Sequence, residues 1–247
     1  MKILLVDIET APHVAHVWGL WQQNVGLPQI LDAGYVLCWS AKWLYKDEVY
    51  FSSTHRDGRE EMLKQIHTLL DEADAVVHYN GTKFDIPTLN KEFLLEGMPP
   101  PSPVKEMDLL KTARSKFRFP SNKLDYICQA LGLGKKIKHA GHELWIKCMN
   151  NDPVAWKEMQ EYNIQDVLLL EKLYIKLLAW IKSHANYGLY KEESEVCPNC
   201  GKDHYQKRGY QYTASCKYQR YQCLDCGTWF RSTQNLGPKA GKKFTGV

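Results

Sequence analysis

The sequence predicts an α/β fold, with a mixed sheet flanked by helices, followed by a small β module at the C-terminal end. Three apolar runs come first with no helical segment between them, and two further runs then alternate with segments of helical periodicity. Two Cys-x2-Cys pairs follow the last helical segment. At 247 residues, the chain can hold one domain of ordinary size and a short second module.

The expected elements follow from periodicity and from turn residues. Strands are expected at residues 2–8, 35–44, 48–53, 74–79 and 104–108. Helices are expected at 57–73, 84–96, 109–116, 122–131, 141–149 and 153–182. Gly97 and the prolines at 99–101 end the second helix. Three strands in a meander, followed by strands that alternate with helices, predict a mixed sheet.

Composition excludes several classes of protein. The chain is 44% hydrophobic and 24% charged, which is typical of a globular protein and not of a disordered one. The apolar start is interrupted by Asp7 and no small-residue cleavage site follows, so no signal peptide is expected. No segment approaches the roughly 18 apolar residues of a membrane span. The eight cysteines do not resemble a secreted disulfide framework, so we expect a cytoplasmic protein in a reducing compartment, without a membrane partner.

Four acidic residues predict a metal site. Asp7 and Glu9 lie two positions apart at the end of an apolar strand, which places both side chains on one face. Two buried carboxylates would each cost several kcal/mol without a compensating cation. Tyr162 and Asp166 are four apart in a helical segment and therefore share a face. Together with Asp85, these residues can present four carboxylates and one phenol to a common point.

The same residues carry a family resemblance. The residues that carry it are Asp7-Ile8-Glu9, Asn80 with Phe84-Asp85-Ile86-Pro87, and Tyr162 with Asp166. In this order they resemble the three motifs of the DEDD (DnaQ-like) 3′→5′ exonucleases on the ribonuclease H-like fold. The tyrosine resembles the DEDDy branch, and the second motif is similar to the proofreading domain of family B polymerases. The resemblance covers about the first 185 residues, so an exonuclease domain is expected at 1–186.

The resemblance implies a mechanism with two Mg²⁺ or Mn²⁺ ions that hydrolyses DNA from single strands or 3′ ends and releases 5′-mononucleotides. Asp7 would bridge both ions, Glu9 and Asp166 would complete one ion's site, and Asp85 would hold the other ion through water. Tyr162 would orient the attacking water.

The resemblance also implies contacts with nucleic acid. The backbone around Thr10 would hold the terminal ribose, and Asn80 and Phe84 are further expected contacts. A polymerase, or a replication or repair protein, is an expected partner. The motifs leave open an RNA-trimming exonuclease, an endonuclease on the same fold, or a non-catalytic zinc-ribbon protein that binds nucleic acid.

Residues 187–247 are expected to form a zinc ribbon with a basic C-terminal tail. Its two knuckles supply four thiolates for one tetrahedral Zn²⁺, namely Cys197, Cys200, Cys223 and Cys226. Residues 210–213 and 217–221 alternate like hairpin strands, and 228–231 could add a third strand. Cys216 lies at the expected hairpin turn and stays open as a ligand in place of a knuckle cysteine.

The ribbon is basic and rich in aromatic residues. From residue 196 onward it has nine Lys or Arg against two Asp, whereas the rest of the chain has a net charge of −3. Cations follow phosphates and aromatic faces stack on unpaired bases, so the ribbon is expected to assist nucleic-acid binding. The candidate contacts are Lys207, Arg208, Tyr218, Arg220 and Trp229. A protein-docking or purely structural role remains open, as does stacking or packing of Trp18 and Trp21 in the loop at 10–31.

Overall fold

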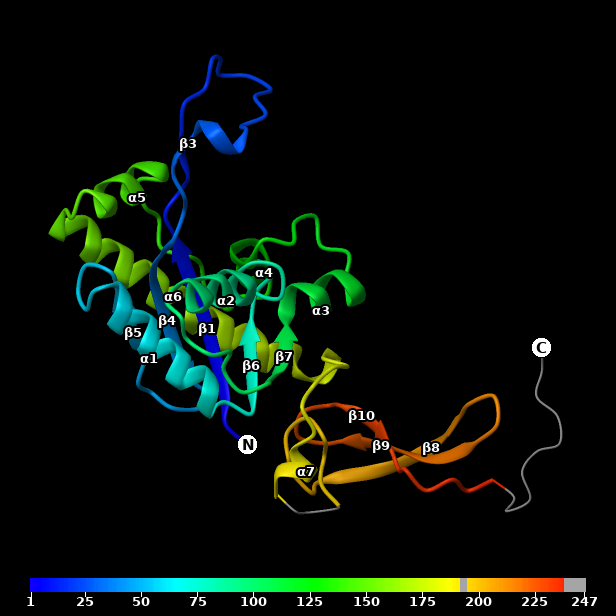
Figure 1. Cartoon of the computed structure of the whole chain (residues 1–247). Coiled ribbons are helices and arrows are strands. Elements are labelled where there is room, and N and C mark those ends of the chain that lie inside the picture. Colours follow the sequence, from blue (N-terminus) through cyan, green and yellow to red (C-terminus); the bar gives the residue numbers. More distant parts are fainter. Residues whose placement is uncertain (192–194, 238–247) are drawn as a thin grey trace. The chain divides into compact units, whose positions relative to one another are not determined.

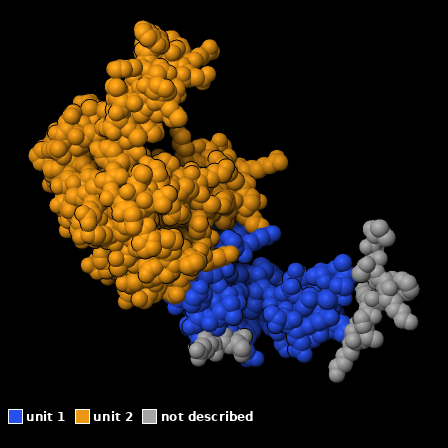
Figure 2. Space-filling view, in the orientation of Figure 1, with its two compact units in different colours: residues 1, 175–247 blue, residues 2–174 orange. Residues whose placement is uncertain are grey.

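The computed structural model describes residues 1–191 and 195–237. The chain divides into two compact units, residues 2–174 and residues 175–247 together with Met1 (Figure 2). The functional boundary expected at residue 187 stays a prediction, and the basic-tail residues Lys239, Lys242 and Lys243 lie outside the described residues.

The first unit is built on a five-stranded mixed sheet with the order β5-β4-β1-β6-β7 (Figure 1). Its strands are β1 (Ile3–Thr10), β4 (Val36–Trp43), β5 (Tyr50–Ser53), β6 (Ala75–His78) and β7 (Lys105–Asp108). The pairs β1–β4 and β4–β5 are antiparallel, and β1–β6 and β6–β7 are parallel. This confirms the predicted mixed sheet, in which a meander is followed by crossover connections.

The helices lie close to the predicted ranges. They are α1 (Arg59–Glu72), α2 (Asp85–Leu95), α3 (Leu109–Lys116), α4 (Leu124–Ala130), α5 (His142–Met149) and α6 (Pro153–Leu177). The long helix is shorter than the predicted 153–182, because a 3-10 turn (Leu178–Trp180) follows it. Gly97, which follows the C-cap residue Glu96 of α2, adopts φ +68°, the left-handed conformation that ends helices. Asp108 caps α3 by accepting a hydrogen bond from the Leu110 amide at 2.9 Å.

The two faces of the sheet have separate cores. On β1, Leu4, Val6 and Ile8 face a cluster that includes residues of α1 and α2. The alternate positions Asp7 and Glu9 therefore point to the opposite face, where α5 and α6 pack on β4 and β5. Figure 1 shows α1 and α6 on different sides of the sheet. The period of the strand thus separates the acidic residues from the apolar core beneath α1.

The segment between β1 and β4, for which the sequence predicts a loop, forms an arm with some regular structure. It contains β2 (Val14–Ala15), a 3-10 turn (Leu27–Gln29) and β3 (Ile30–Asp32), and β2 pairs antiparallel with β3. Figure 1 shows this arm extending beyond the sheet. Trp18 and Trp21 are 99% and 85% exposed, so they do not pack against the domain. Their stacking on bases stays a prediction.

The second unit contains a three-stranded antiparallel sheet with the order β10-β9-β8. Its strands are β8 (Tyr205–Tyr212), β9 (Lys217–Cys223) and β10 (Trp229–Arg231), and a short helix, α7 (Tyr187–Lys191), precedes them. The hairpin and the third strand agree with the sequence prediction, although β8 begins earlier than expected. In the part of the chain that the structure describes, no helix has the length and apolar character needed to cross a membrane.

Candidate active site and cysteine cluster

Three carboxylates meet beside the central strand of the sheet. Asp7 and Glu9 come from β1, and Asp166 comes from α6. One carboxylate oxygen from each of the three lies within 4.8 Å of the other two. The period of two in the strand and the packing of α6 against this face of the sheet therefore bring the first and third sequence motifs together.

The helix α6 contributes two further side chains to this site. Tyr162 lies one turn before Asp166 and is buried. The Asn163 amide, which the sequence analysis did not single out, donates to Asp7 Oδ2 at 2.7 Å. Asp166 Oδ1 is buried and has no hydrogen-bond partner among the described residues. An unpartnered buried carboxylate oxygen is a position where a bound cation would be stabilising.

Asp85 lies at the start of α2 and is buried. Its Oδ1 accepts a hydrogen bond from the Ile8 amide at 3.2 Å, which fixes it beside β1 between Asp7 and Glu9. It does not belong to the group of three carboxylates that lie within direct reach of one another. The four carboxylates therefore form a cluster of three with one beside it, and the expectation that Asp85 acts through water stays a prediction.

Burial and mutual repulsion raise the pKa values of these acids. Burial raises the pKa of Asp7 well above its usual range, and the neighbouring carboxylates of Asp166, Asp85 and Glu9 add to this effect. Burial raises the pKa of Glu9 to about 8 and that of Asp85 to about 6. The raised pKa values indicate that nearby positive charge does not offset the burial and mutual repulsion of the four acids. Carboxylate oxygens are the ligands that Mg²⁺ and Mn²⁺ prefer. The donor set thus fits a divalent cation.

Lys136 is a member of the site that the sequence analysis missed. Its Nζ contacts Asp166 Oδ2 and donates to the Tyr162 hydroxyl at 3.0 Å. Burial alone would lower the pKa of Lys136, but the Asp166 carboxylate and the Tyr162 hydroxyl raise it above its ordinary value. The Lys136 amide donates to Asp125 Oδ1 at 2.8 Å, which holds this loop residue at the site. No local pattern marks this lysine among its neighbours in the chain.

The predicted nucleic-acid contacts of the first unit occupy different positions around the carboxylates. Thr10 is the last residue of β1, one position after Glu9. Asn80 adopts φ +73°, and its amide donates to Asp108 Oδ1 at 3.0 Å. Phe84 directly precedes α2 and is 43% exposed. Contacts between these residues and nucleic acid stay predictions.

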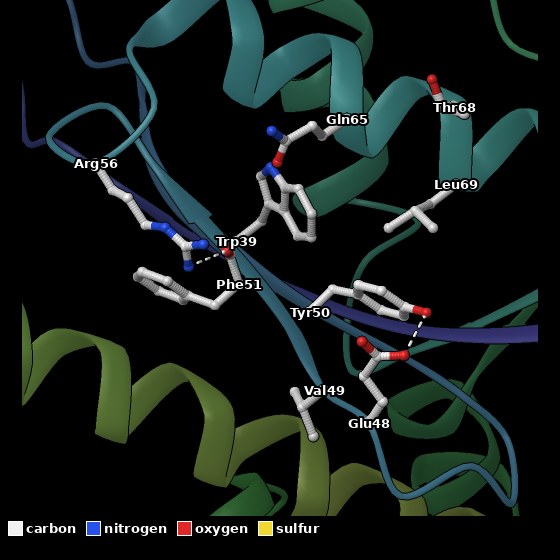
Figure 3. Close-up of a pocket in the computed structure, with 9 residues that line it drawn as sticks. All are labelled: Trp39, Glu48, Val49, Tyr50, Phe51, Arg56, Gln65, Thr68 and Leu69. Atoms are coloured by element: carbon white, nitrogen blue, oxygen red, sulfur yellow. Dashed lines mark hydrogen bonds between the residues drawn. The ribbon is translucent and has the colours of Figure 1, made fainter.

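A hollow of about 450 Å³ lies elsewhere in the first unit (Figure 3). Residues of β4, β5 and α1 line it, among them Trp39, Tyr50 and Leu69. The Tyr50 hydroxyl donates to Glu48 at 2.8 Å, and Arg56 donates to the Phe51 carbonyl at 3.2 Å. None of the four carboxylates lines this hollow, so it is separate from the candidate active site.

The four knuckle cysteines converge in the second unit. The Sγ atoms of Cys197 and Cys226 are 3.7 Å apart, those of Cys200 and Cys223 are 3.6 Å apart, and all four lie within 4.8 Å of one another. Four thiolates about 2.3 Å from one tetrahedral Zn²⁺ would be separated from one another by about 3.8 Å. The cluster therefore fits Zn²⁺, whereas Cys216 lies outside it.

Both knuckles turn at a glycine. The Gly201 amide donates to the Cys197 carbonyl at 2.8 Å, and the Gly227 amide donates to the Cys223 carbonyl at 3.2 Å. These glycines adopt φ +69° and +79°, a conformation that side chains disfavour. Each Cys-x2-Cys-Gly sequence thus forms a tight turn that ends at a glycine in the left-handed conformation.

A sequence model of the RNase H superfamily matches residues 34–178, which is more than half of the chain. The chain therefore belongs to the RNase H superfamily. The matched range contains Asp85, Tyr162 and Asp166, and it begins after the strand that carries Asp7 and Glu9. A comparison with curated proteins gives no match.

Among solved structures, the chain is similar to the family B DNA polymerase from the hyperthermophilic archaeon Pyrobaculum calidifontis. The TM-score is 0.55 at 14% sequence identity, and the similarity covers 90% of this chain and 33% of the polymerase chain. The chain thus spans about one third of the polymerase's length. At this identity the likeness shows the fold alone, and together with the superfamily match it confirms the predicted ribonuclease H-like fold.

Proposed function

We propose that the chain is a metal-dependent 3′→5′ exonuclease of the DEDDy type that hydrolyses phosphodiester bonds of DNA at single strands or 3′ ends. The observation that carries this proposal is the convergence of Asp7, Glu9 and Asp166, whose oxygens lie within 4.8 Å of one another. The superfamily match and the position of Tyr162 one turn before Asp166 support it.

Asp7, Glu9 and Asp166, with Asp85 beside them, would hold two Mg²⁺ or Mn²⁺ ions. Bound there, such ions lower the pKa of an attacking water and stabilise the negative charge on the leaving 3′-oxygen. Asn163 keeps one Asp7 oxygen in place through its 2.7 Å hydrogen bond. Because α6 supplies both Asn163 and Asp166, its packing on the sheet decides whether the ligands reach one another.

Tyr162 would orient the water that attacks the phosphorus. Burial raises the pKa of its hydroxyl above the ordinary value, so the hydroxyl keeps its proton at neutral pH and can donate a hydrogen bond. Lys136 donates to the same hydroxyl at 3.0 Å and thereby fixes its direction. The lysine cation also adds positive charge where the phosphate's negative charge would develop.

The proposal is tested with end-labelled single-stranded DNA, duplex DNA and RNA in the presence of Mg²⁺ or Mn²⁺. DNA should shorten from its 3′ end and release 5′-mononucleotides, and a chelator should stop the reaction. Asp7→Ala and Asp166→Ala should reduce cleavage to background, whereas Asp47→Ala, at an exposed acid in the turn after β4, should cleave like the wild type.

Each other outcome points to a different function. Preference for RNA would support the RNA-trimming alternative, and internal cuts would support an endonuclease. Binding without cleavage would indicate a non-catalytic protein. Full activity in either alanine variant would refute the assignment of the site.

A further inference from the structure

The two faces of the C-terminal sheet differ in chemistry. The strand register places Trp229 opposite Gln222 and Arg231 opposite Arg220, so these four side chains share one face. Tyr218 lies two positions before Arg220 on β9 and joins them. The intervening residues point to the other face. The register therefore divides the ribbon's aromatic residues into two sets that the sequence could not separate.

Three aromatic residues of one set form the ribbon's own small core, whereas Tyr210 and Tyr212 on the same face are exposed. Tyr221 and Phe230 pair across β9 and β10 with stacked rings 5.4 Å apart, and Tyr205 packs its edge against both rings at 5.3 Å. The thiol-bearing Cys223 lies on the same face as Tyr221 and is buried. This face therefore contributes to the folding of the ribbon around the cysteine cluster.

The aromatic residues of the other set, half-buried Tyr218 and exposed Trp229, are stacked with arginines. The guanidinium carbon of Arg231 lies 3.7 Å from the centre of the Tyr218 ring. Those of Arg220 and Arg208 lie 5.0 and 6.0 Å from the centre of the Trp229 ring. Trp229 is 50% exposed, and the three arginines are exposed. We call these five residues the arginine face.

The positive charge of this face is not compensated by acids. β8, β9 and β10 contain no Asp or Glu. Within residues 1–191 and 195–237, none of the three arginines pairs with a carboxylate. Arg220 Nε instead donates to the Arg208 carbonyl at 3.0 Å, which holds two like charges over one indole ring. Such an arrangement is stabilised by a polyanion that supplies several negative groups at once.

We propose that the arginine face binds single-stranded nucleic acid. Phosphates would accept hydrogen bonds from the guanidinium groups, and unpaired bases would stack on the aromatic rings and the guanidinium planes. In a duplex the faces of the paired bases stack on one another, so they cannot stack on such a surface. The inference rests on the proposed function for its class of ligand, but it concerns a binding surface separate from the carboxylates.

Lys207 provides a matched comparison. The sequence analysis included it among the candidate nucleic-acid contacts, but the register places it opposite Tyr221, on the face that does not carry Arg220 and Arg231. Lys217 shares that other face, because it lies four positions before Tyr221 on β9, and its Nζ lies 3.8 Å from the centre of the Tyr210 ring. Replacing these two lysines changes the net charge by the same amount as replacing two arginines of the proposed surface.

The test measures binding of a fluorescent single-stranded oligothymidine of about 20 nucleotides to the full chain by anisotropy. The protein carries Asp7→Ala and no Mg²⁺ or Mn²⁺ is added, so the oligonucleotide stays intact. Arg220→Gln/Arg231→Gln should weaken binding about tenfold or more and reduce the slope of log K against log salt by about 1 to 1.5. Lys207→Gln/Lys217→Gln should change affinity by less than about threefold.

A third variant separates stacking from charge. Trp229→Leu should weaken binding by about five- to a hundredfold while the salt slope stays constant, since no cation is lost. Zinc content and circular dichroism check that each variant folds. Equal weakening by both charge-matched pairs would overturn the proposal in favour of general electrostatic attraction. Unchanged affinity in the arginine pair would overturn it in favour of a protein-docking or structural face.

The binding assay is independent of cleavage. Absence of cleavage by the wild-type protein would contradict the proposed nuclease activity but would not affect the result of the binding assay. Conversely, a chain that degrades DNA but binds the oligonucleotide equally well without its arginine pair would contradict only the arginine face. The matched duplex, tested in parallel, should bind more weakly than the single strand, and equal binding would contradict the stacking of bases.

Discussion

The carboxylate of Glu9 should make the stability of the protein depend on pH when no Mg²⁺ or Mn²⁺ is present. Burial raises its pKa in the folded state to about 8, from an ordinary value of 4.5. Between these two values the folded protein keeps a proton that the unfolded chain has released. The contribution of Glu9 to stability is therefore most favourable below about pH 4.5, falls as the pH rises from there, and levels off above about pH 8. The full difference corresponds to about 5 kcal/mol at most.

Glu9→Gln isolates this contribution, because it keeps the size of the side chain and removes its titration. Urea unfolding without added Mg²⁺ or Mn²⁺, measured from about pH 5 to 8.5, should show wild-type stability falling by several kcal/mol relative to the variant. The variant should therefore be more stable than the wild type at pH 8. Glu61→Gln, at an exposed position of α1, should follow the wild type.

A divalent cation should reverse the effect. If the carboxylates bind Mg²⁺, saturating Mg²⁺ at pH 8 should stabilise the wild type, since the ion binds the folded state and offsets the repulsion. The same addition should stabilise Glu9→Gln much less. Wild-type and Glu9→Gln curves that run parallel over the whole pH range, with or without Mg²⁺, would refute the reasoning.

Three further changes test single contacts. Tyr162→Phe removes the hydroxyl and keeps all carboxylates. Single-turnover cleavage with saturating Mg²⁺ should therefore slow about tenfold or more, while substrate affinity stays constant. A wild-type rate would show that the hydroxyl takes no part in the mechanism. Elemental analysis of protein purified without added metal should find about one Zn²⁺ per chain in Cys216→Ser and none in Cys200→Ser. The reverse result would contradict the assignment of the four cysteines as a zinc site. Asn163→Ala takes away the 2.7 Å donor of Asp7 and should lower the free energy of unfolding by about 1–3 kcal/mol; denaturation curves that coincide with the wild type would show that this hydrogen bond is not stabilising.

Much of the fold and of the candidate site could be predicted from local patterns. The alternation of β1 places Asp7 and Glu9 on one face of a strand, and the helical spacing of Tyr162 and Asp166 places them on one face of α6. The knuckle sequence likewise predicts two thiols on a turn that ends in a glycine. These features depend on the backbone geometry of a few consecutive residues, which side-chain identity alone largely determines.

Other members of the two sites were decided by the tertiary structure. Lys136 reaches Asp166 only because its amide is held by Asp125, a residue eleven positions earlier. Arg208 reaches Trp229 from a different strand, past an irregularity in the register of β8. The sequence by itself determined which residue types lie on each strand and helix. Only the tertiary structure decided which of them meet, because strand register and loop position depend on contacts between residues that are far apart in the chain.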